Sequence, residues 1–388
     1  MNRSGDNRSD APPVRQAVII AGGRGTRLGA LTDKTPKPLL DVGGRPFIEH
    51  LLFELDRSGI EEAVLLVGPF GDVFRRALRP ERPRQPRLVL VSEPEPAGTA
   101  GALWHARESL ADRFYVLNGD SILDGNLLRL DAASRAEPLA GAMAVLAVPD
   151  TARYGRVELA GDRVSVFREK GEAGPGLVNA GVYLFHRDRV FARIATPPSS
   201  LEQEILPALA AERSLRAVMY QGRFVDIGIP ASLAAARGLF PAWHRRPAAL
   251  IALDALLGLE RGGNLPVTDL RWRRGAEAAL RRLNDAGCYA IVLAAPSAAP
   301  GLRRRMNTAL MPAAAHIDGL FAPRFLGTDA TLLRAVEAEW PIEREGSFLI
   351  MSGSWETEKE SAPLLPVFRA AGDSDLDDLV SAALGDRG

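Results

Sequence analysis

The stretch VIIAGGRGTRLGALTDKTPKPLL, residues 18–40, decides the fold of the N-terminal half of this chain of 388 residues. Its apolar start predicts a strand, and the glycines that follow are typical of backbone that approaches a phosphate. Pro38 has no backbone N–H and disfavours helical geometry at Lys37, so a continuous helix of ordinary length cannot begin at Gly25. We therefore predict an extended loop that carries basic residues.

This loop is similar to a dinucleotide-binding fingerprint, and an arginine at position 24 or 27 would suit NADP. That fingerprint requires a helix to begin at the loop, because the helix N-terminus holds the pyrophosphate. Pro36 and Pro38 argue against such a helix and hence against an NADP-dependent oxidoreductase. Backbone N–H groups together with Arg27 and Lys37 suit the concentrated charge of a triphosphate better.

Composition excludes several classes of function. Basic and acidic residues balance at 48 each, so no overall field favours a nucleic acid polymer or a membrane surface. The single cysteine, Cys288, cannot form an intrachain disulfide, which fits a reducing compartment. Residues 1–13 lack the apolar centre of a signal peptide, and no later run reaches ~18 uninterrupted apolar residues. We expect a cytoplasmic protein without a membrane segment.

Two domains are predicted from the order of apolar and polar runs. Between residues 14 and about 237, β-rich runs such as EAVLLVG and FYVLNGD alternate with helical stretches, which favours a mostly parallel sheet flanked by helices. The stretch GLFPAWHRRPAA interrupts this pattern, and a second strand–helix–strand series follows. We predict a disordered tail (1–13), a first domain (14–240), a linker (241–247) and a second, smaller α/β domain (248–386). Whether the chain forms a homo-oligomer is left open by the sequence.

The loop resembles the first motif of the sugar-1-phosphate nucleotidyltransferases, approximately GGxGTRLxxLTxxxPKPLL. Four further stretches resemble later motifs of that family in order: EPAGTAGAL (95–103), LNGDSI (117–122), REK with LVNAGVYLF (168–170 and 177–185), and FVDIGIPASL (224–233). The resemblance implies an α/β fold with a Rossmann-like mixed sheet, of the GT-A-like type, in the first domain.

Two aspartates come at the ends of apolar runs, Asp120 in FYVLNGD and Asp226 in RFVDIG. Ligands of open α/β sheets bind at the carboxyl ends of the strands, where such side chains lie. Mg²⁺ prefers hard oxygen ligands and keeps some of its waters. The resemblance implies that these same two aspartates hold the metal, so Asp120 and Asp226 are the predicted metal residues and Mg²⁺ is the predicted cofactor.

The reaction that the resemblance implies is attack by a sugar-1-phosphate oxygen on the α-phosphorus of a nucleoside triphosphate, with release of pyrophosphate. The nucleophile is already an anion, so we assign no general base. The predicted catalytic residues are Arg27, Lys37 and Asp120. The predicted nucleotide-binding residues are Ala21, Gly22, Gly23, Gly25, Thr26, Glu95, Gly98 and Thr99. The predicted residues for the sugar phosphate are Gly155, Glu169, Lys170, Asn179 and Gly181.

The second domain is similar to the haloacid-dehalogenase-like phosphatases, in particular those that act on heptose bisphosphate. Asp254 matches the position of their nucleophile, but Leu256 stands where a second aspartate belongs and Ala294 where a hydroxyl belongs. No lysine occurs between Lys170 and Lys359, and the late strand offers Ser352 and Ser354, with Glu356 as the nearest carboxylate. Since an aspartyl-phosphate mechanism needs a metal and a proton donor, we expect a catalytically silent domain.

In relatives, this pairing of domains makes nucleotide-activated heptose, usually in the GDP form. We therefore expect a guanylyltransferase that uses GTP and a heptose-1-phosphate or related sugar-1-phosphate. Two alternatives remain: a non-catalytic regulatory paralogue that binds sugar nucleotides, and a bifunctional enzyme with residual sugar phosphatase activity.

Overall fold

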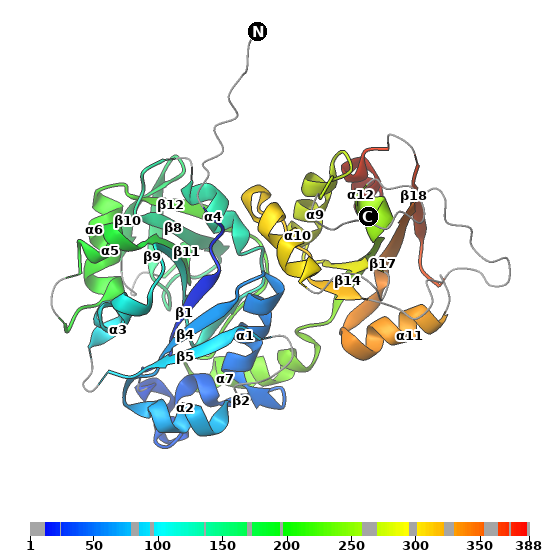
Figure 1. Ribbon diagram of the computed structural model, residues 1–388. Coiled ribbons are helices and arrows are strands. Elements are labelled where there is room, and N and C mark those ends of the chain that lie inside the picture. The colour runs from blue at the N-terminus through cyan, green and yellow to red at the C-terminus, as the bar shows by residue number, and fades with distance from the viewer. Residues whose placement is uncertain are drawn as a thin grey trace, which may run out of the picture. The chain divides into compact units, whose positions relative to one another are not determined.

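The computed structural model describes residues 12–23, 25–78, 85–93, 97–135, 137–168, 173–194, 197–257, 270–294, 301–321, 330–352, 364–371 and 374–385. Contacts within the chain divide it into two compact units (Figure 1). The first unit contains Met1–Asp56 and Ile60–Pro241, and the second contains Arg57–Gly59 and Ala242–Gly388. Among the helices of these ranges, none is long and apolar enough to cross a membrane.

One half of the first unit's sheet is parallel. Its strands are β1 (Gln16–Ile20), β4 (Glu62–Leu66), β5 (Arg87–Val91) and β6 (Arg113–Asn118), in the order β5-β4-β1-β6. The helices that follow β1, β4 and β5 are α1 (Phe47–Arg57), α2 (Gly71–Ala77) and α3 (Gly98–Ala106). Parallel neighbours need such crossover connections, which explains the alternation of apolar and helical runs in this part of the chain.

The other half of the sheet is mostly antiparallel, which differs from the mostly parallel sheet predicted from that alternation. It continues from β6 through β11 (Gly176–His186), β8 (Gly141–Val148), β12 (Leu215–Tyr220), β10 (Arg163–Arg168) and β9 (Arg156–Ala160). Strands β9 and β10 are joined by only two residues, a link that permits an antiparallel hairpin and no crossover helix. The whole sheet is therefore mixed, as the resemblance implied.

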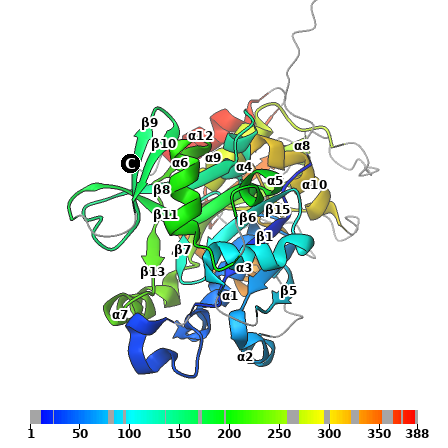
Figure 2. The ribbon, with the colours of Figure 1, turned by 90° about the vertical axis from the view of Figure 1, so that its left-hand side faces the viewer.

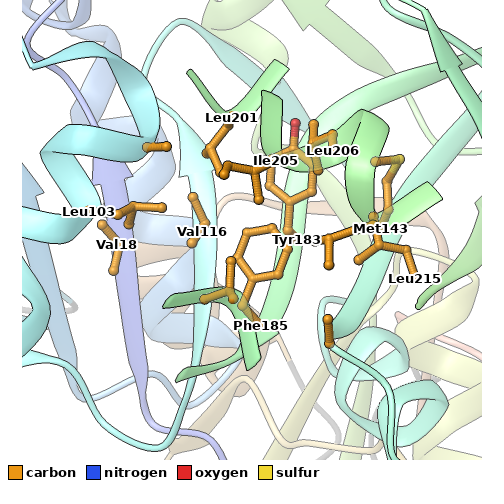
Figure 3. Close-up of a cluster of buried hydrophobic side chains, with 14 of the residues drawn as sticks. Val18, Leu103, Val116, Met143, Tyr183, Phe185, Leu201, Ile205, Leu206 and Leu215 are labelled. Atoms are coloured by element: carbon orange, nitrogen blue, oxygen red, sulfur yellow. The ribbon is translucent and has the colours of Figure 1, made fainter. Parts of the chain in front are cut away.

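The main core of the first unit lies between this sheet and the helices on one face. Figure 3 shows Val18, Val116 and Tyr183 of the strands against Leu103 of α3 and Leu206 of α6 (Leu206–Ala211). On the other face, α4 (Leu128–Ser134) packs against β8, β11 and β12. Because both faces are covered, the strands are apolar on both sides, and ligands have access only at the strand ends.

The second unit has a five-stranded parallel sheet in the order β16-β15-β14-β17-β18. Its strands are β14 (Arg246–Ala252), β15 (Tyr289–Leu293), β16 (Gly319–Phe321), β17 (Ile342–Ser352) and β18 (Val367–Ala370). Its helices are α8 (Leu253–Leu257), α9 (Ala276–Asp285), α10 (Leu302–Leu310), α11 (Ala330–Glu339) and α12 (Leu376–Gly385). Strand β14 begins at Arg246, within the stretch 241–247 that the sequence analysis predicts as a linker. This unit is a doubly wound α/β fold.

The loop that opened the sequence analysis forms short turns of 3-10 helix. They are η1 (Thr26–Thr32), which is kinked at Gly29, and η2 (Lys37–Leu39), which Pro36 precedes. The prediction that no ordinary helix begins at Gly25 is confirmed, whereas the predicted extended conformation is wrong. A 3-10 turn closes with few residues, so it fits between Gly25 and the prolines.

Candidate active site

The candidate site lies where the strand order of the first unit reverses, between β1 and β6. From β1 the chain adds β4 and β5 on one side, whereas β6 joins on the other side. The backbone N–H of Gly119, after β6, donates a hydrogen bond of 2.9 Å to the carbonyl of Ile20. A Cβ atom on Gly119 would come within 2.6 Å of that carbonyl oxygen, so glycine allows this close approach. Such reversal points are where open α/β sheets bind ligands.

A cavity of about 270 Å³ opens at this point. The predicted residues that line it are Ala21, Gly23, Arg27, Lys37, Thr99, Asp120, Gly155, Asn179, Gly181 and Asp226. Arg27 is exposed, and no hydrogen bond joins its guanidinium to another described residue. Segments far apart in the sequence thus meet at one cavity, which is lined by both basic and acidic side chains.

Four predicted residues lie beside the cavity without lining it: Gly22, Gly25, Thr26 and Gly98. Gly22 packs so closely on Gly68 that a Cβ atom would come within 2.8 Å of the Gly68 nitrogen. Gly98 has a positive φ of 73° at the start of α3, and its Cβ would come within 2.3 Å of the Ser199 carbonyl. Both glycines therefore shape the loops around the cavity. Glu95, Glu169 and Lys170 lie outside the described residues.

Lys37 occupies a buried position between the glycine loop and Asp120. Gly25 adopts a left-handed conformation, with φ 63°, and a Cβ atom there would lie 3.2 Å from Cε of Lys37. The Thr32 hydroxyl donates to the Gly25 carbonyl at 3.1 Å and holds this turn. The Lys37 ammonium donates to Oδ2 of Asp120 at 2.8 Å. The turn at Gly25 therefore holds the Lys37 ammonium against the Asp120 carboxylate.

The two predicted metal carboxylates lie on neighbouring strands. Asp226 ends β13 (Phe224–Asp226), which pairs antiparallel with β7 (Ser121–Leu123) and sets Asp226 opposite Ser121. Figure 2 shows these two short strands beside each other. The N–H of Ile227 donates to the backbone carbonyl of Asp120 at 2.9 Å. This pairing brings together two aspartates from different parts of the chain.

Asp226 is surrounded by hydrogen-bond donors. One guanidinium nitrogen of Arg153 lies 3.1 and 3.0 Å from its two oxygens, and the Tyr154 hydroxyl donates at 2.9 Å. The N–H of Gly228 donates at 2.9 Å from the start of the next loop. Burial and the neighbouring Asp226 charge raise the pKa of Tyr154 to about 12. The tyrosine is therefore protonated at neutral pH and acts as a donor to the carboxylate.

The residues present fit a Mg²⁺ ion that is bound jointly with a substrate. Within the described ranges, no group of three or more His, Cys, Asp and Glu side chains is placed to hold a metal. Mg²⁺ commonly takes one or two protein carboxylates, together with substrate phosphates and waters. Asp120 and Asp226 supply that number of carboxylates at the cavity wall.

A β-bulge in β11 shapes the opposite wall of the cavity. The register between β11 and β8 shifts between Asn179 and Tyr183, and Gly181 has a positive φ of 69°. The Asn179 amide donates to the Tyr183 hydroxyl at 2.6 Å, and its oxygen accepts from the N–H of Gly181 at 2.9 Å. Bulges of this kind turn side chains toward binding sites. Asn179 is thus held in one orientation at the cavity.

Five polar residues that line the cavity were not predicted from sequence: Asn118, Ser121, Arg153, Tyr154 and Glu202. Asn118 and Ser121 lie within the quoted motif 117–122, whereas the other three lie outside every quoted motif. Glu202 accepts a hydrogen bond of 2.7 Å from the Thr99 hydroxyl, so its position depends on α3. Arg153 and Tyr154 directly precede the predicted Gly155, and this adjacency was the available signal. Glu202 had no such signal, because its side chain reaches the cavity through a π-helical turn, Leu201–Ile205.

The second unit also places a carboxylate where its strand order reverses. Asp254 follows β14 in α8, and its Oδ2 accepts a hydrogen bond of 2.8 Å from the Ser352 hydroxyl at the end of β17. The N–H of Ala255 donates to its Oδ1 at 2.8 Å. Leu256 and Ala294 are buried. Ser354, Glu356 and Lys359 lie outside the described residues.

Comparison with known proteins gives matches to the first unit. The chain matches the family described as nucleotidyl transferase over residues 16–239. It is 36% identical over 225 residues to a mannose-1-phosphate guanylyltransferase catalytic subunit beta of Danio rerio, which covers 55% of this chain and 61% of that protein. It is also 36% identical over 223 residues to a probable mannose-1-phosphate guanylyltransferase 1 of Oryza sativa subsp. japonica, covering 55% and 62%. The chain thus spans about three fifths of the length of these relatives.

Among solved structures, HddC from Yersinia pseudotuberculosis is similar to the first unit. The TM-score is 0.53 and the identity 29%, and the match covers 58% of this chain and 100% of HddC. A second structure of HddC, complexed with GMP-PN, gives a TM-score of 0.53 at 28% identity with the same coverage. The matched part is the unit that contains the cavity.

Proposed function

The chain belongs to the nucleotidyl transferase family, and from this premise we propose that it transfers a nucleoside monophosphate from a nucleoside triphosphate to a sugar-1-phosphate. The observation that carries the proposal is the ion pair of Lys37 and Asp120 at the strand reversal, inside the cavity lined by Arg27 and Asp226. A site that aligns two polyanions needs cations and metal-binding carboxylates together, and this cavity contains both.

The proposed reaction needs no general base. A phosphate oxygen of the sugar-1-phosphate attacks the α-phosphorus, a new P–O bond forms, and the bond between the α-phosphorus and the bridging oxygen to the β-phosphate breaks. The electron pair of that bond leaves with pyrophosphate. Arg27 and the backbone of Gly23, Gly25 and Thr26 hold the β- and γ-phosphates. Lys37 contacts the transferring phosphate, where charge develops in the transition state.

The metal in this proposal is Mg²⁺, and Asp120 and Asp226 would hold it. When bound, it supplies positive charge near the phosphate oxygens of the transferring and leaving groups. On the sugar side, Asn179 is oriented by the bulge of β11 to bond hydroxyls. Glu169 and Lys170 have the predicted roles of accepting sugar hydroxyl bonds and neutralising the sugar phosphate.

The proposed nucleotide is GTP and the proposed sugar phosphate is a heptose-1-phosphate or a related sugar-1-phosphate. The names of the relatives support a guanylyl group, because two of them are guanylyltransferases of mannose-1-phosphate. The complex of HddC with GMP-PN also supports a guanine nucleotide. Mannose-1-phosphate is therefore the related sugar phosphate to test first.

Pyrophosphate release from ATP, GTP, CTP and UTP against several sugar-1-phosphates tests the proposal. The sugars include heptose-, mannose- and glucose-1-phosphate, and Mg²⁺ is present. We expect release with GTP and at least one of these sugars, and formation of the nucleotide sugar by mass spectrometry. Binding without turnover in every pair would instead support the non-catalytic regulatory paralogue.

For the second unit we propose a catalytically silent relative of the haloacid-dehalogenase-like phosphatases. Leu256 supports this proposal, because a buried leucine cannot protonate a leaving group. Hydrolysis of a sugar bisphosphate by the full chain, lost in Asp254→Asn, would overturn it and support the bifunctional alternative. The cytoplasmic location predicted from the single cysteine stays a prediction.

A further inference from the structure

The two carboxylates proposed to hold Mg²⁺ differ in how many of their oxygens are already occupied. Asp120 uses Oδ2 for Lys37, and its Oδ1 accepts no hydrogen bond from any described residue. Asp226 has both oxygens occupied by Arg153, and Tyr154 and Gly228 add further donors. A cation that is to bind both aspartates therefore finds one open carboxylate oxygen at Asp120 and none at Asp226.

We propose that Arg153 is an internal counter-cation of Asp226 in the metal-free site, and that binding of a divalent cation displaces it. The proposal rests on the metal site of the proposed function and adds a residue to it. A guanidinium and a divalent cation repel each other, and Mg²⁺ needs a ligand distance of about 2.0–2.1 Å to its oxygens. Each carboxylate oxygen has about two lone-pair positions. Arg153 takes one on each oxygen of Asp226, and Gly228 and Tyr154 take the others, so a metal ion that binds there displaces a donor.

Arg153 is the group best able to leave, because it is the most exposed member of this cluster. Its side chain is 42% exposed, whereas that of Asp226 is 16% exposed. Tyr154 is held by an edge contact with the Phe224 ring, with ring centroids 5.7 Å apart. Its hydroxyl and the N–H of Gly228 can continue to orient Asp226 after the arginine has moved. Lys37 need not leave, since Oδ1 of Asp120 is open.

The displaced guanidinium has a use in the proposed reaction. Arg153 lines the cavity together with Gly155 and Asn179, on the wall assigned to the sugar phosphate. A guanidinium presents a planar fork that binds two phosphate oxygens. Metal binding would thus release a phosphate-binding arginine at the moment when the site becomes competent. Arg153 then acts as a positioning residue in the metal-free site and contacts the sugar phosphate in the loaded site.

Binding of Mn²⁺ to the full chain without nucleotide tests the exchange. Electron paramagnetic resonance measures free Mn²⁺ directly and needs no turnover. We expect Arg153→Gln to bind Mn²⁺ about five- to tenfold more tightly than the wild type, because no internal cation competes. The matched control is Arg223→Gln, which removes the same charge near β13 but whose guanidinium binds Asp124 at 2.8 Å. The control should change the Kd by less than about twofold.

Two further variants make the result decisive. Asp226→Asn should weaken Mn²⁺ binding at least tenfold, which places the bound ion at this carboxylate. Arg153→Lys keeps the charge without the fork and should give an intermediate Kd, and it replaces the glutamine variant if that one fails to fold. In steady-state assays Arg153→Gln should raise the KM for the sugar-1-phosphate at least fivefold and that for the triphosphate less than twofold.

An unchanged or weaker Mn²⁺ affinity in a folded Arg153→Gln protein would overturn the exchange. So would an equal gain in affinity in Arg223→Gln, since that outcome reflects net charge alone. Failure of nucleotidyl transfer with every substrate pair would overturn the proposed function but would leave the Mn²⁺ measurement readable. The two failures are therefore distinguishable.

Discussion

Two carboxylates lie beside a reversal of strand order, one in each unit, and their surroundings differ. Asp120 of the first unit is bonded to the Lys37 ammonium and faces a cavity lined by Arg27. Asp254 of the second unit accepts from a serine hydroxyl, and the chain beside it buries Leu256. A reversal of strand order offers the same location in both units. The described partner of the carboxylate, an ammonium in one unit and a hydroxyl in the other, therefore separates the two locations better than the fold does.

The largest expected effect comes from breaking the ion pair of the first unit. Lys37→Ala and Asp120→Asn should each lower turnover by about a hundredfold or more, because each removes a partner of the charge that develops in the transition state. Pyrophosphate release measures the effect. Lys34→Ala is the control, since Lys34 is exposed on the same loop. Near-normal pyrophosphate release by either Lys37→Ala or Asp120→Asn would show that this ion pair does not distinguish the first unit from the second.

A smaller effect is expected from moving Lys37 without deleting it. Gly25→Ala places a methyl group 3.2 Å from Cε of Lys37 on a left-handed residue, so turnover should fall by about tenfold. The matched control is Gly301→Ala, because Gly301 is also left-handed, with φ 79° and ψ 8°, but no atom lies within 4 Å of a Cβ placed there. Both variants carry similar backbone strain of about 1–2 kcal/mol. Equal losses of turnover would show that strain alone acts.

Glu93 provides a test on stability within the first unit. It is buried, its Oε2 accepts no hydrogen bond in the described part of the chain, and burial raises the pKa of its carboxyl. A carboxyl with a raised folded-state pKa costs stability above that pKa, and the cost disappears as the pH falls toward the unfolded value. Glu93→Gln should therefore raise the Tm by about 2 °C at pH 7.5. The gain should vanish near pH 4, and a constant gain would contradict this cause.

The smallest effect is expected from the corresponding change in the second unit. Asp254→Asn keeps a group that can accept from Ser352 and removes only the charge. We expect pyrophosphate release by the full chain to stay within twofold of the wild type. A tenfold loss would show that the second unit takes part in the reaction. The same assay with Ser352→Ala separates a local packing effect from the effect of the charge.

Local chemistry was predictable from the sequence, whereas pairing between distant strands was not. Pro36 and Pro38 were enough to exclude an ordinary helix at Gly25, because proline acts on its own neighbours. The resemblance brought Asp120 and Asp226 into one site, but their proximity depends on the pairing of β7 with β13. No periodicity in either segment specifies that register, since both strands have only three residues.

Three polar cavity residues that lie outside every quoted motif were not identified from sequence, and one physical reason explains this. Arg153, Tyr154 and Glu202 act through contacts with residues distant in sequence, on Asp226 and Thr99. A sequence motif reports residue types at fixed spacing, but it does not report which side chain a guanidinium reaches. The register shift in β11 could not be predicted from sequence either, because it depends on how Gly181 packs on Asn118, which is distant in the sequence.

The buried position of Lys37 makes this residue a chemical reporter of the site. The chain has four lysines, Lys34, Lys37, Lys170 and Lys359, so an amine-acylating reagent yields few side-chain products for peptide mass spectrometry. Lys34 is exposed and should react readily, whereas Lys37, 8% exposed and bonded to Asp120, should react slowly. The ratio of the two adducts gives an internally referenced footprint. Each candidate ligand could thus be screened by acylation alone, without a coupled enzyme or a radioactive substrate.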